Sequence, residues 1–399
     1  MNVLFLSHRL PYAPNRGDRV RAFHLLRELS RWAQIDVVAL AHDAEEASHA
    51  DDLKSVARSV VAARVPKALN LARAAFALPS RRPTTHSLLA SPEFDRAVDA
   101  AASARRPDVV LAYCTGIAPA AFRPSLQNAP VVLDMVDVDS QKWASLSASS
   151  APPRSWIYAR ESRVLAAFEA EASRRAAATL VVNDKERAAL ASIAPDATIH
   201  AVENGVDLAA LRPSSPPGDE PVVVFCGVMN YAPNVEGAVW LSREVWPQVR
   251  ASRPDARLEI VGAHPTGAVQ ALDDPSAGIH VRGSVPDVRP HLWAAAVSAA
   301  PLHTARGIQN KVLEAVAAGL PVVVTPAVME GLPPEVRAAC AEAHTPEIFA
   351  ASLVSLLALS PEGRRQRAGT AALDALTWDR RLANLEALFA EAASRNGVR

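Results

Sequence analysis

Short apolar runs of strand length recur along the chain and constrain its fold more than any other feature. In the first half each run is followed by a longer segment of helical or mixed character, and the runs are 3–6, 35–40, 109–112, 131–133 and 180–182. A run that is apolar throughout, rather than alternating, is typical of a parallel strand covered on both faces. The alternation of such strands with helices predicts a doubly wound α/β sheet.

The same pattern begins again after a proline-rich stretch. Residues 212–219 read Arg-Pro-Ser-Ser-Pro-Pro-Gly-Asp, which suits neither a helix nor a central strand. A second series of apolar runs follows at 222–225, 258–261, 279–281, 297–300 and 322–324. A chain of 399 residues also favours two cores over one. We therefore predict two Rossmann-like domains, 1–210 and 211–375, which face a central cleft, and an amphipathic C-terminal helix in 376–399 near the domain junction.

The bulk composition excludes several classes of protein. The 42 basic residues balance 42 acidic ones, which argues against nucleic acid as the main partner. The cysteines Cys114, Cys226 and Cys340 are too scattered to indicate a disulfide framework or a zinc site. No apolar run approaches the roughly 20 residues that span a bilayer, and the N-terminus has no basic leader. We expect a cytoplasmic protein.

One segment, 54–82, could contact the inner face of the membrane. It contains several lysine and arginine residues, interleaved with apolar ones, but no aspartate or glutamate. A basic amphipathic segment of this kind can rest on anionic lipid headgroups. The alternative is a solvated basic helix that covers the first sheet.

The strongest cluster of chemistry-bearing residues lies between two strands of the second series, from Arg306 to Glu314. Ligands of open parallel sheets bind beyond the carboxyl ends of the strands, where helix N-termini attract anions. Gly307 lets the backbone approach a ligand, Asn310 can cap the next helix, and Lys311 adds a positive charge there. The segment, which includes Ile308, predicts a diphosphate site.

Glu314 lies one helical turn further, on the same face as Asn310 and Lys311. A carboxylate in this position could accept hydrogen bonds from both hydroxyls of a ribose. The alternative is that Lys311 and Glu314 form an ordinary surface ion pair, which is worth about 0.2–0.5 kcal/mol.

The string from Arg306 to Val323 resembles the donor-binding signature of the family-four retaining glycosyltransferases. In that family two glutamates, separated by seven residues, precede a small-residue helix and a Gly-x-Pro-Val-Val strand. Glu314 matches the second glutamate, and Arg306 stands where the first would be. The resemblance implies a GT-B fold whose C-terminal domain holds a nucleotide-sugar donor. Arg306 would then contact phosphate or an acidic sugar.

Further segments resemble the same family in the same order. Gly227 and Asn230 lie in the turn where the donor phosphates approach, and Arg282 and Val285 lie in the strand and loop that line the nucleotide base. A turn without a ligand is the alternative in both places. Residues 203–207 resemble the interdomain hinge, where Gly205 would supply a positive φ and Asp207 a local cap.

In the first half, Gly17 matches one of the family's two glycines that approach the donor phosphates and the acceptor. Arg19 and Arg21, together with Arg9 and Arg16, make this loop basic, which suits an anionic acceptor or the diphosphate. Solvated arginines are the alternative.

The group that contacts the acceptor hydroxyl is predicted after the run 131–133, where many relatives carry a histidine. Here Asp134 and Asp137 could orient or deprotonate a hydroxyl once burial tunes their pKa values. Trp143 could line the acceptor cleft or pack in the core. Residues 137–139 also spell the Asp-x-Asp of metal-dependent glycosyltransferases, but they lie in the half that is not expected to hold the donor, so we expect no metal.

Within the family, the chain resembles the PEP-CTERM/exosortase-associated sugar transferases through Gly17-Asp18, 134–143 and 306–314. This implies retaining, metal-independent transfer of a hexose to a glycan or lipid-linked acceptor in exopolysaccharide biosynthesis. The nucleotide sugar would be a substrate, and no cofactor is expected. The alternatives are a nucleotide-sugar 2-epimerase of the GT-B fold and a non-catalytic nucleotide-sugar-binding protein.

Overall fold

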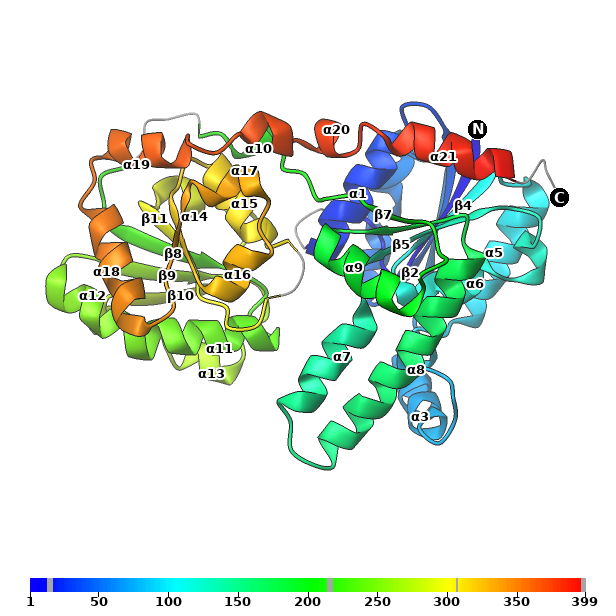
Figure 1. Ribbon diagram of the computed structural model, residues 1–399, viewed down its shortest axis with the longest axis horizontal. Coiled ribbons are helices and arrows are strands. Elements are labelled where there is room, and N and C mark those ends of the chain that lie inside the picture. Colours follow the sequence, from blue (N-terminus) through cyan, green and yellow to red (C-terminus); the bar gives the residue numbers. More distant parts are fainter. Residues whose placement is uncertain (13–16, 214–217, 306–307, 396–399) are drawn as a thin grey trace. The chain divides into compact units, whose positions relative to one another are not determined.

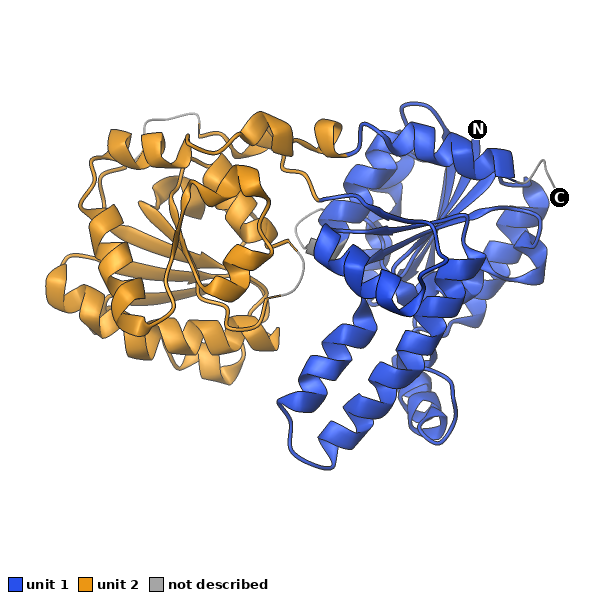
Figure 2. Ribbon diagram, in the orientation of Figure 1, with its two compact units in different colours: residues 1–203, 382–399 blue, residues 204–381 orange. Residues whose placement is uncertain are grey.

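The computed structural model describes residues 1–12, 17–213, 218–305 and 308–395, which form two compact units (Figures 1 and 2). Unit 1 comprises Met1–Glu203 and the C-terminal segment from Leu382, and unit 2 comprises Asn204–Arg381. Each unit contains one parallel sheet flanked by helices. The predicted pair of doubly wound α/β domains is confirmed.

The sheet of unit 1 has the strand order β3-β2-β1-β4-β5-β6-β7 over the described residues, and every pair is parallel. The strands are β1 (Asn2–Ser7), β2 (Gln34–Ala41), β3 (Ser59–Arg64), β4 (Val109–Tyr113), β5 (Val131–Val136), β6 (Ala178–Val181) and β7 (Ile199–Ala201). The apolar runs predicted all but β3 and β7. The central strands β1, β4 and β5 are buried along nearly their whole length, which explains their continuous apolar character.

The helices of unit 1 include a hairpin that extends away from the sheet (Figure 1). They are α1 (Gly17–Leu29), α2 (Ala44–Ser48), α3 (Lys67–Ala77), α4 (Thr84–Leu88), α5 (Pro92–Ala104), α6 (Ala118–Ala121), α7 (Asp139–Ala148), α8 (Arg154–Arg175), α9 (Asp184–Ile193) and α21 (Leu385–Ser394). Helices α7 and α8 form the hairpin. The segment 54–82 is not one amphipathic helix, because β3 joins the sheet before α3 begins.

The sheet of unit 2 has the order β10-β9-β8-β11-β12-β13, again with parallel pairs throughout the described residues. The strands are β8 (Val222–Cys226), β9 (Arg257–Val261), β10 (Ile279–Gly283), β11 (Val297–Ala300), β12 (Val322–Val324) and β13 (Cys340–Glu342). All but β13 were predicted. The helices are α10 (Leu208–Leu211), α11 (Ala232–Trp240), α12 (Trp246–Ser252), α13 (Gly267–Gln270), α14 (Arg289–Ala294), α15 (Asn310–Ala317), α16 (Pro326–Glu330), α17 (Pro334–Arg337), α18 (Pro346–Leu357), α19 (Pro361–Ala368) and α20 (Trp378–Arg381).

The segments that connect the units differ from the expectation in two details. Residues 204–210, which precede the proline-rich stretch, belong to unit 2. The prediction of one amphipathic helix in 376–399 is wrong, because two helices, α20 and α21, lie in this range. Trp378 is buried in unit 2, whereas Phe389 of α21 is buried in unit 1 with its ring 5.7 Å from that of Trp32. Each helix is thus anchored in a different unit.

The predicted hinge motif is half confirmed. The side chain of Asp207 caps α10 by accepting a hydrogen bond from the Ala210 amide at 3.1 Å. Gly205, however, does not have a positive φ. Glycine is needed there for space, since a Cβ atom would lie 2.5 Å from the backbone of Trp378. Of the helices described, none has both the length and the apolar character that crossing a bilayer requires.

Candidate functional site

The strand order of unit 2 reverses between β8 and β11, which are neighbours in the sheet. Strands β9 and β10 continue on one side and β12 and β13 on the other. Loops beyond the carboxyl ends of two such strands form the usual ligand crevice of a doubly wound sheet. The turn that begins at Gly227 follows β8, and helix α15 follows β11. The two segments predicted to hold the donor therefore meet at this point.

Lys311 joins the two segments. Its Nζ atom donates a hydrogen bond to Oδ1 of Asn234 at 2.6 Å and lies 5.0 Å from the centre of the Phe225 ring. The Asn234 amide nitrogen in turn donates to the Val228 carbonyl at 2.9 Å. A Cβ atom on Gly227 would come within 2.8 Å of that nitrogen, so glycine leaves room for Asn234. Asn234, absent from the predicted set, thus holds the ammonium group in place.

Lys311 and Glu314 are both half-buried, and they do not form an ion pair with each other. Burial raises the pKa of Glu314 to about 7, against the opposing effect of Lys311. Burial likewise lowers the pKa of Lys311 to about 8. The interpretation as a surface ion pair is therefore wrong. Partly desolvated groups with shifted pKa values at a ligand crevice are typical of a functional site.

The start of α15 differs from the prediction. Asn310 is the first helical residue rather than the cap, and the preceding Gln309 makes no side-chain cap hydrogen bond. The Asn310 side-chain oxygen instead accepts a hydrogen bond from the side-chain nitrogen Nδ2 of Asn204 at 3.0 Å. Ile308 is buried in the core of unit 2. Arg306 and Gly307 lie outside the described residues.

The predicted base-binding residues have structural partners of their own. Arg282 donates to Oε1 of Glu259 at 2.6 Å, and His291 contacts Oε2 of the same carboxylate at 2.9 Å. Burial alone would raise the pKa of Glu259, but these hydrogen bonds hold it below its usual value. Val285 packs against the core, and Asn230 is exposed. Glu259 could have been recognised in the sequence, because it is the single carboxylate within the apolar run 258–261.

In unit 1, Arg21 and Asp134 form a fully buried ion pair. The guanidinium Nε lies 2.9 Å from Oδ2 of Asp134, and both side chains have 0% exposure. Arg21 also donates to the Val202 carbonyl at 2.8 Å, and Oδ1 of Asp134 accepts from the Val136 amide at 3.0 Å. Asp134 was predicted to be catalytic and Arg21 to bind the acceptor. In the structure, both side chains are fully buried and bonded to groups within unit 1.

Arg9 and Arg19, two other residues of the basic loop, lie beside one buried carboxylate. Glu46 lies 3.3 Å from Arg9 and 3.3 Å from Arg19, and it accepts a hydrogen bond from the Leu10 amide. The predicted positive charge of this loop is therefore partly neutralised. Gly17 is the first residue of α1, and Arg16 lies outside the described residues.

Asp137 remains the candidate for contact with an acceptor hydroxyl. Val136 adopts a φ of 66°, unusual for a β-branched residue, and the chain turns sharply there after β5. The half-buried Asp137 that follows has an Oδ1 atom without a hydrogen-bond partner in the protein. Burial raises the pKa of Asp137 to about 7, and the negative charges of Glu186 and Asp139 add to this effect.

Two further carboxylates hold the start of α7 beside Asp137. Glu186 accepts from the Val138 amide at 2.7 Å, and Glu169 accepts from the Ser140 amide at 3.1 Å. They lie on other helices, so sequence spacing gave no sign of them. Within the described ranges, no three His, Cys, Asp or Glu side chains are grouped to hold a metal. Trp143 packs against Tyr158 within the α7–α8 hairpin, with ring centres 5.2 Å apart.

Comparison with protein families assigns both units. Residues 220–359 match the model described as glycosyl transferases group 1, and residues 16–205 match the glycosyl transferase 4-like domain. No curated protein matches the chain. The two adjoining matches, together with the fold, define a glycosyltransferase of the GT-B class. The chain belongs to the GT-B glycosyltransferases built from these two domains.

Solved structures support the same fold over the whole chain. Sucrose-phosphate synthase from Thermosynechococcus elongatus is 15% identical with a TM-score of 0.72, and the match covers 99% of this chain and 100% of that one. Anabaena HepE in complex with UDP-glucose is 15% identical with a TM-score of 0.64, covering 99% and 100%. The N-terminal domain of Candida albicans trehalose-6-phosphate phosphatase is 13% identical with a TM-score of 0.67, covering 98% and 97%.

Proposed function

We propose that the chain transfers a hexose from a nucleoside diphosphate sugar to a glycan or lipid-linked acceptor, with retention of the anomeric configuration and without a metal. The product would belong to exopolysaccharide biosynthesis. The observation that carries the proposal is the half-buried pair Lys311 and Glu314 at the switch point of unit 2. Lys311 would stabilise the leaving diphosphate, and Glu314 would hold the ribose.

The choice of donor follows from a structural relative. HepE, which shares the fold, has been solved with UDP and with UDP-glucose. UDP-glucose is therefore the first donor to test. Asp137 is the proposed contact for the acceptor hydroxyl. A lipid-linked acceptor would bring the protein to the inner face of the cytoplasmic membrane, with the segment 54–82 as the proposed contact.

The experiment is a turnover assay with UDP-, GDP- and ADP-sugars and a mixture of glycan and polyprenyl acceptors. We expect a glycoside whose anomeric configuration, read by NMR, equals that of the donor, and equal rates with and without a chelator. A free epimerised sugar nucleotide would identify the 2-epimerase, and tight binding without turnover would identify a binding protein. Inversion, or loss of activity in chelator that Mg²⁺ restores, would contradict the retaining, metal-independent mechanism.

Donor affinity is expected to follow a bell-shaped pH profile. Glu314 accepts hydroxyl hydrogen bonds best when ionised, which requires a pH above its raised pKa of about 7. Lys311 attracts the diphosphate only when protonated, which requires a pH below its lowered pKa of about 8. UDP binding, measured by calorimetry from pH 5.5 to 9.5, should therefore be strongest between about 7 and 8.

Single variants identify the two limbs of that profile. Glu314→Gln should remove the loss of affinity on the acidic side, and Lys311→Met should remove the loss on the alkaline side. A flat profile in the unmodified protein would contradict the assignment of both groups to the donor site.

A further inference from the structure

Helix α3 presents an apolar face to solvent. The side chains of Leu71 and Phe76 are 69% and 83% exposed, and Leu69 is also exposed. The opposite side of the helix, at Asn70, Ala74 and Ala77, is buried against unit 1. After Lys67, every exposed residue of α3 is alanine, leucine or phenylalanine. We call Leu69, Leu71 and Phe76 the α3 face.

Cations that form no ion pair lie on α3 and in the loop after it. They are Lys67 and Arg73 on the helix and Arg81 and Arg82 in the loop. No ion pair among the described residues involves any of the four. Arg73 makes one neutral hydrogen bond, to the Asn70 side chain at 3.1 Å. This set, the basic rim, is therefore available to anionic groups.

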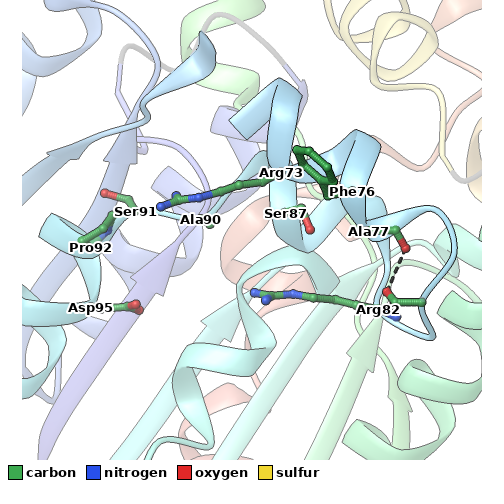
Figure 3. A pocket seen from close by; sticks show the side chains of 10 residues that line it. Arg73, Phe76, Ala77, Arg82, Ser87, Ala90, Ser91, Pro92 and Asp95 are labelled. Carbon is green, nitrogen blue, oxygen red and sulfur yellow. Dashed lines mark hydrogen bonds between the residues drawn. The ribbon is translucent and has the colours of Figure 1, made fainter. Parts of the chain in front are cut away.

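Two members of the basic rim line a pocket at the base of the α3 face. The pocket has a volume of about 510 Å³ and lies between α3, α4 and the start of α5. Figure 3 shows the side chains of Arg73 and Arg82 on either side of Ser87, with Phe76 near Arg73. The carboxylate in the lining, Asp95, is paired with Arg123 at 3.1 Å. Two arginines in the lining of one pocket, together with an exposed aromatic ring, suit a phosphate ester that carries an apolar chain.

Helix α8 extends the apolar surface. Arg160 of α8 donates to the carbonyls of Ala77, Ser80 and Arg82, and so fixes the helix against the end of α3 and its loop. Trp156 lies one turn earlier on the same side of α8 and is 69% exposed, with Ile157 beside it. Exposed tryptophan near arginine is typical of side chains at the boundary between lipid and water.

We propose that the α3 face and Trp156 insert into an anionic lipid surface, while Arg73 and Arg82 bind a lipid phosphate in the pocket. This deepens the proposed membrane contact and replaces the broad segment 54–82 with a defined site. Charge favours lipid over a second copy of the chain, because a symmetric dimer through this face would bring the unpaired cations of both copies together. Anionic headgroups neutralise them.

Co-sedimentation of the full chain with vesicles tests the site. We expect binding to vesicles of phosphatidylglycerol and phosphatidylcholine in equal parts, and none to phosphatidylcholine alone. The double variant Arg73→Gln/Arg82→Gln should lower the partition coefficient about 30-fold, since each cation near an anionic surface contributes a factor of about five. Phe76→Ser should lower it about tenfold, through the loss of an inserted ring.

Matched controls come from unit 2. Arg380→Gln and Ile348→Ser change an exposed cation and an exposed apolar residue away from the site, and both should bind vesicles like the unmodified protein. Equal binding by the α3 variants, no binding by the unmodified chain, or a dimer in sedimentation velocity that Phe76→Ser dissolves would overturn the proposal. Vesicle binding needs neither donor nor acceptor, so its failure is distinguishable from failure of glycosyl transfer, which the turnover assay reports separately.

Discussion

Replacing Glu314 with alanine is expected to weaken UDP binding by about 100-fold. The proposed carboxylate accepts hydrogen bonds from both ribose hydroxyls, and a hydrogen bond to a charged group contributes about 1.5 kcal/mol or more. Loss of two such bonds costs about 3 kcal/mol, which corresponds to about a hundredfold change in Kd. Isothermal calorimetry with UDP at pH 7.5 measures this directly, because ribose is present without the sugar.

The ligand uridine separates the roles of Glu314 and Lys311. Glu314→Ala should lower the affinity for uridine and for UDP by the same factor, whereas Lys311→Met should lower only the affinity for UDP. Glu244→Gln, an exposed carboxylate of unit 2, serves as the matched control and should leave both affinities unchanged. If Glu314→Ala bound UDP like the unmodified protein, the assignment of the ribose to this residue would be wrong.

How far the sequence predicts the fold depends on how each strand is buried. Strands β1, β4 and β8 lie in the middle of their sheets and are buried on both faces, so their apolar runs identify them. Strand β3 lies at an edge, alternates exposed and covered residues and ends at Arg64, so the basic segment 54–82 around it suggested a helix surface instead. Strands β7 and β13 have three residues each and, unlike the equally short β12, include a histidine or a glutamate, so no apolar run identifies them.

The candidate site shows the same limit at the level of side chains. Lys311 and Glu314 share a helix, so their spacing alone placed them on one face. The partner of Lys311 is Asn234, and that of Arg21 is Asp134, each distant in the sequence. Such pairs depend on which strands become neighbours. Because Asp134 directly follows the apolar run 131–133, where a catalytic residue was expected, its sequence context could not distinguish a reacting carboxylate from a buried counter-ion within β5.

Replacing Asp134 with alanine is therefore expected to destabilise unit 1 by about 3–5 kcal/mol, since it leaves the buried Arg21 without a counter-charge. For a unit of this size the melting temperature should fall by about 10 °C, measured as the corresponding transition in calorimetry. Arg21→Met/Asp134→Leu removes both charges and fills the space with apolar atoms, and it should recover most of the loss. That recovery identifies the ion pair, rather than the aspartate alone, as the cause.

Asp137→Ala, the same change three residues further on, is the matched control. The pKa of Asp137 is raised in the folded protein to about 7, so folding favours its protonated form and its ionisation costs stability as the pH rises from about 4 to 7. At pH 8 its removal should leave the melting temperature unchanged or slightly higher, while transfer to the acceptor falls. An Asp134→Ala protein that melts like the unmodified chain but transfers no sugar would contradict the role of Asp134 as a buried counter-ion and would return it to the candidate catalytic residues.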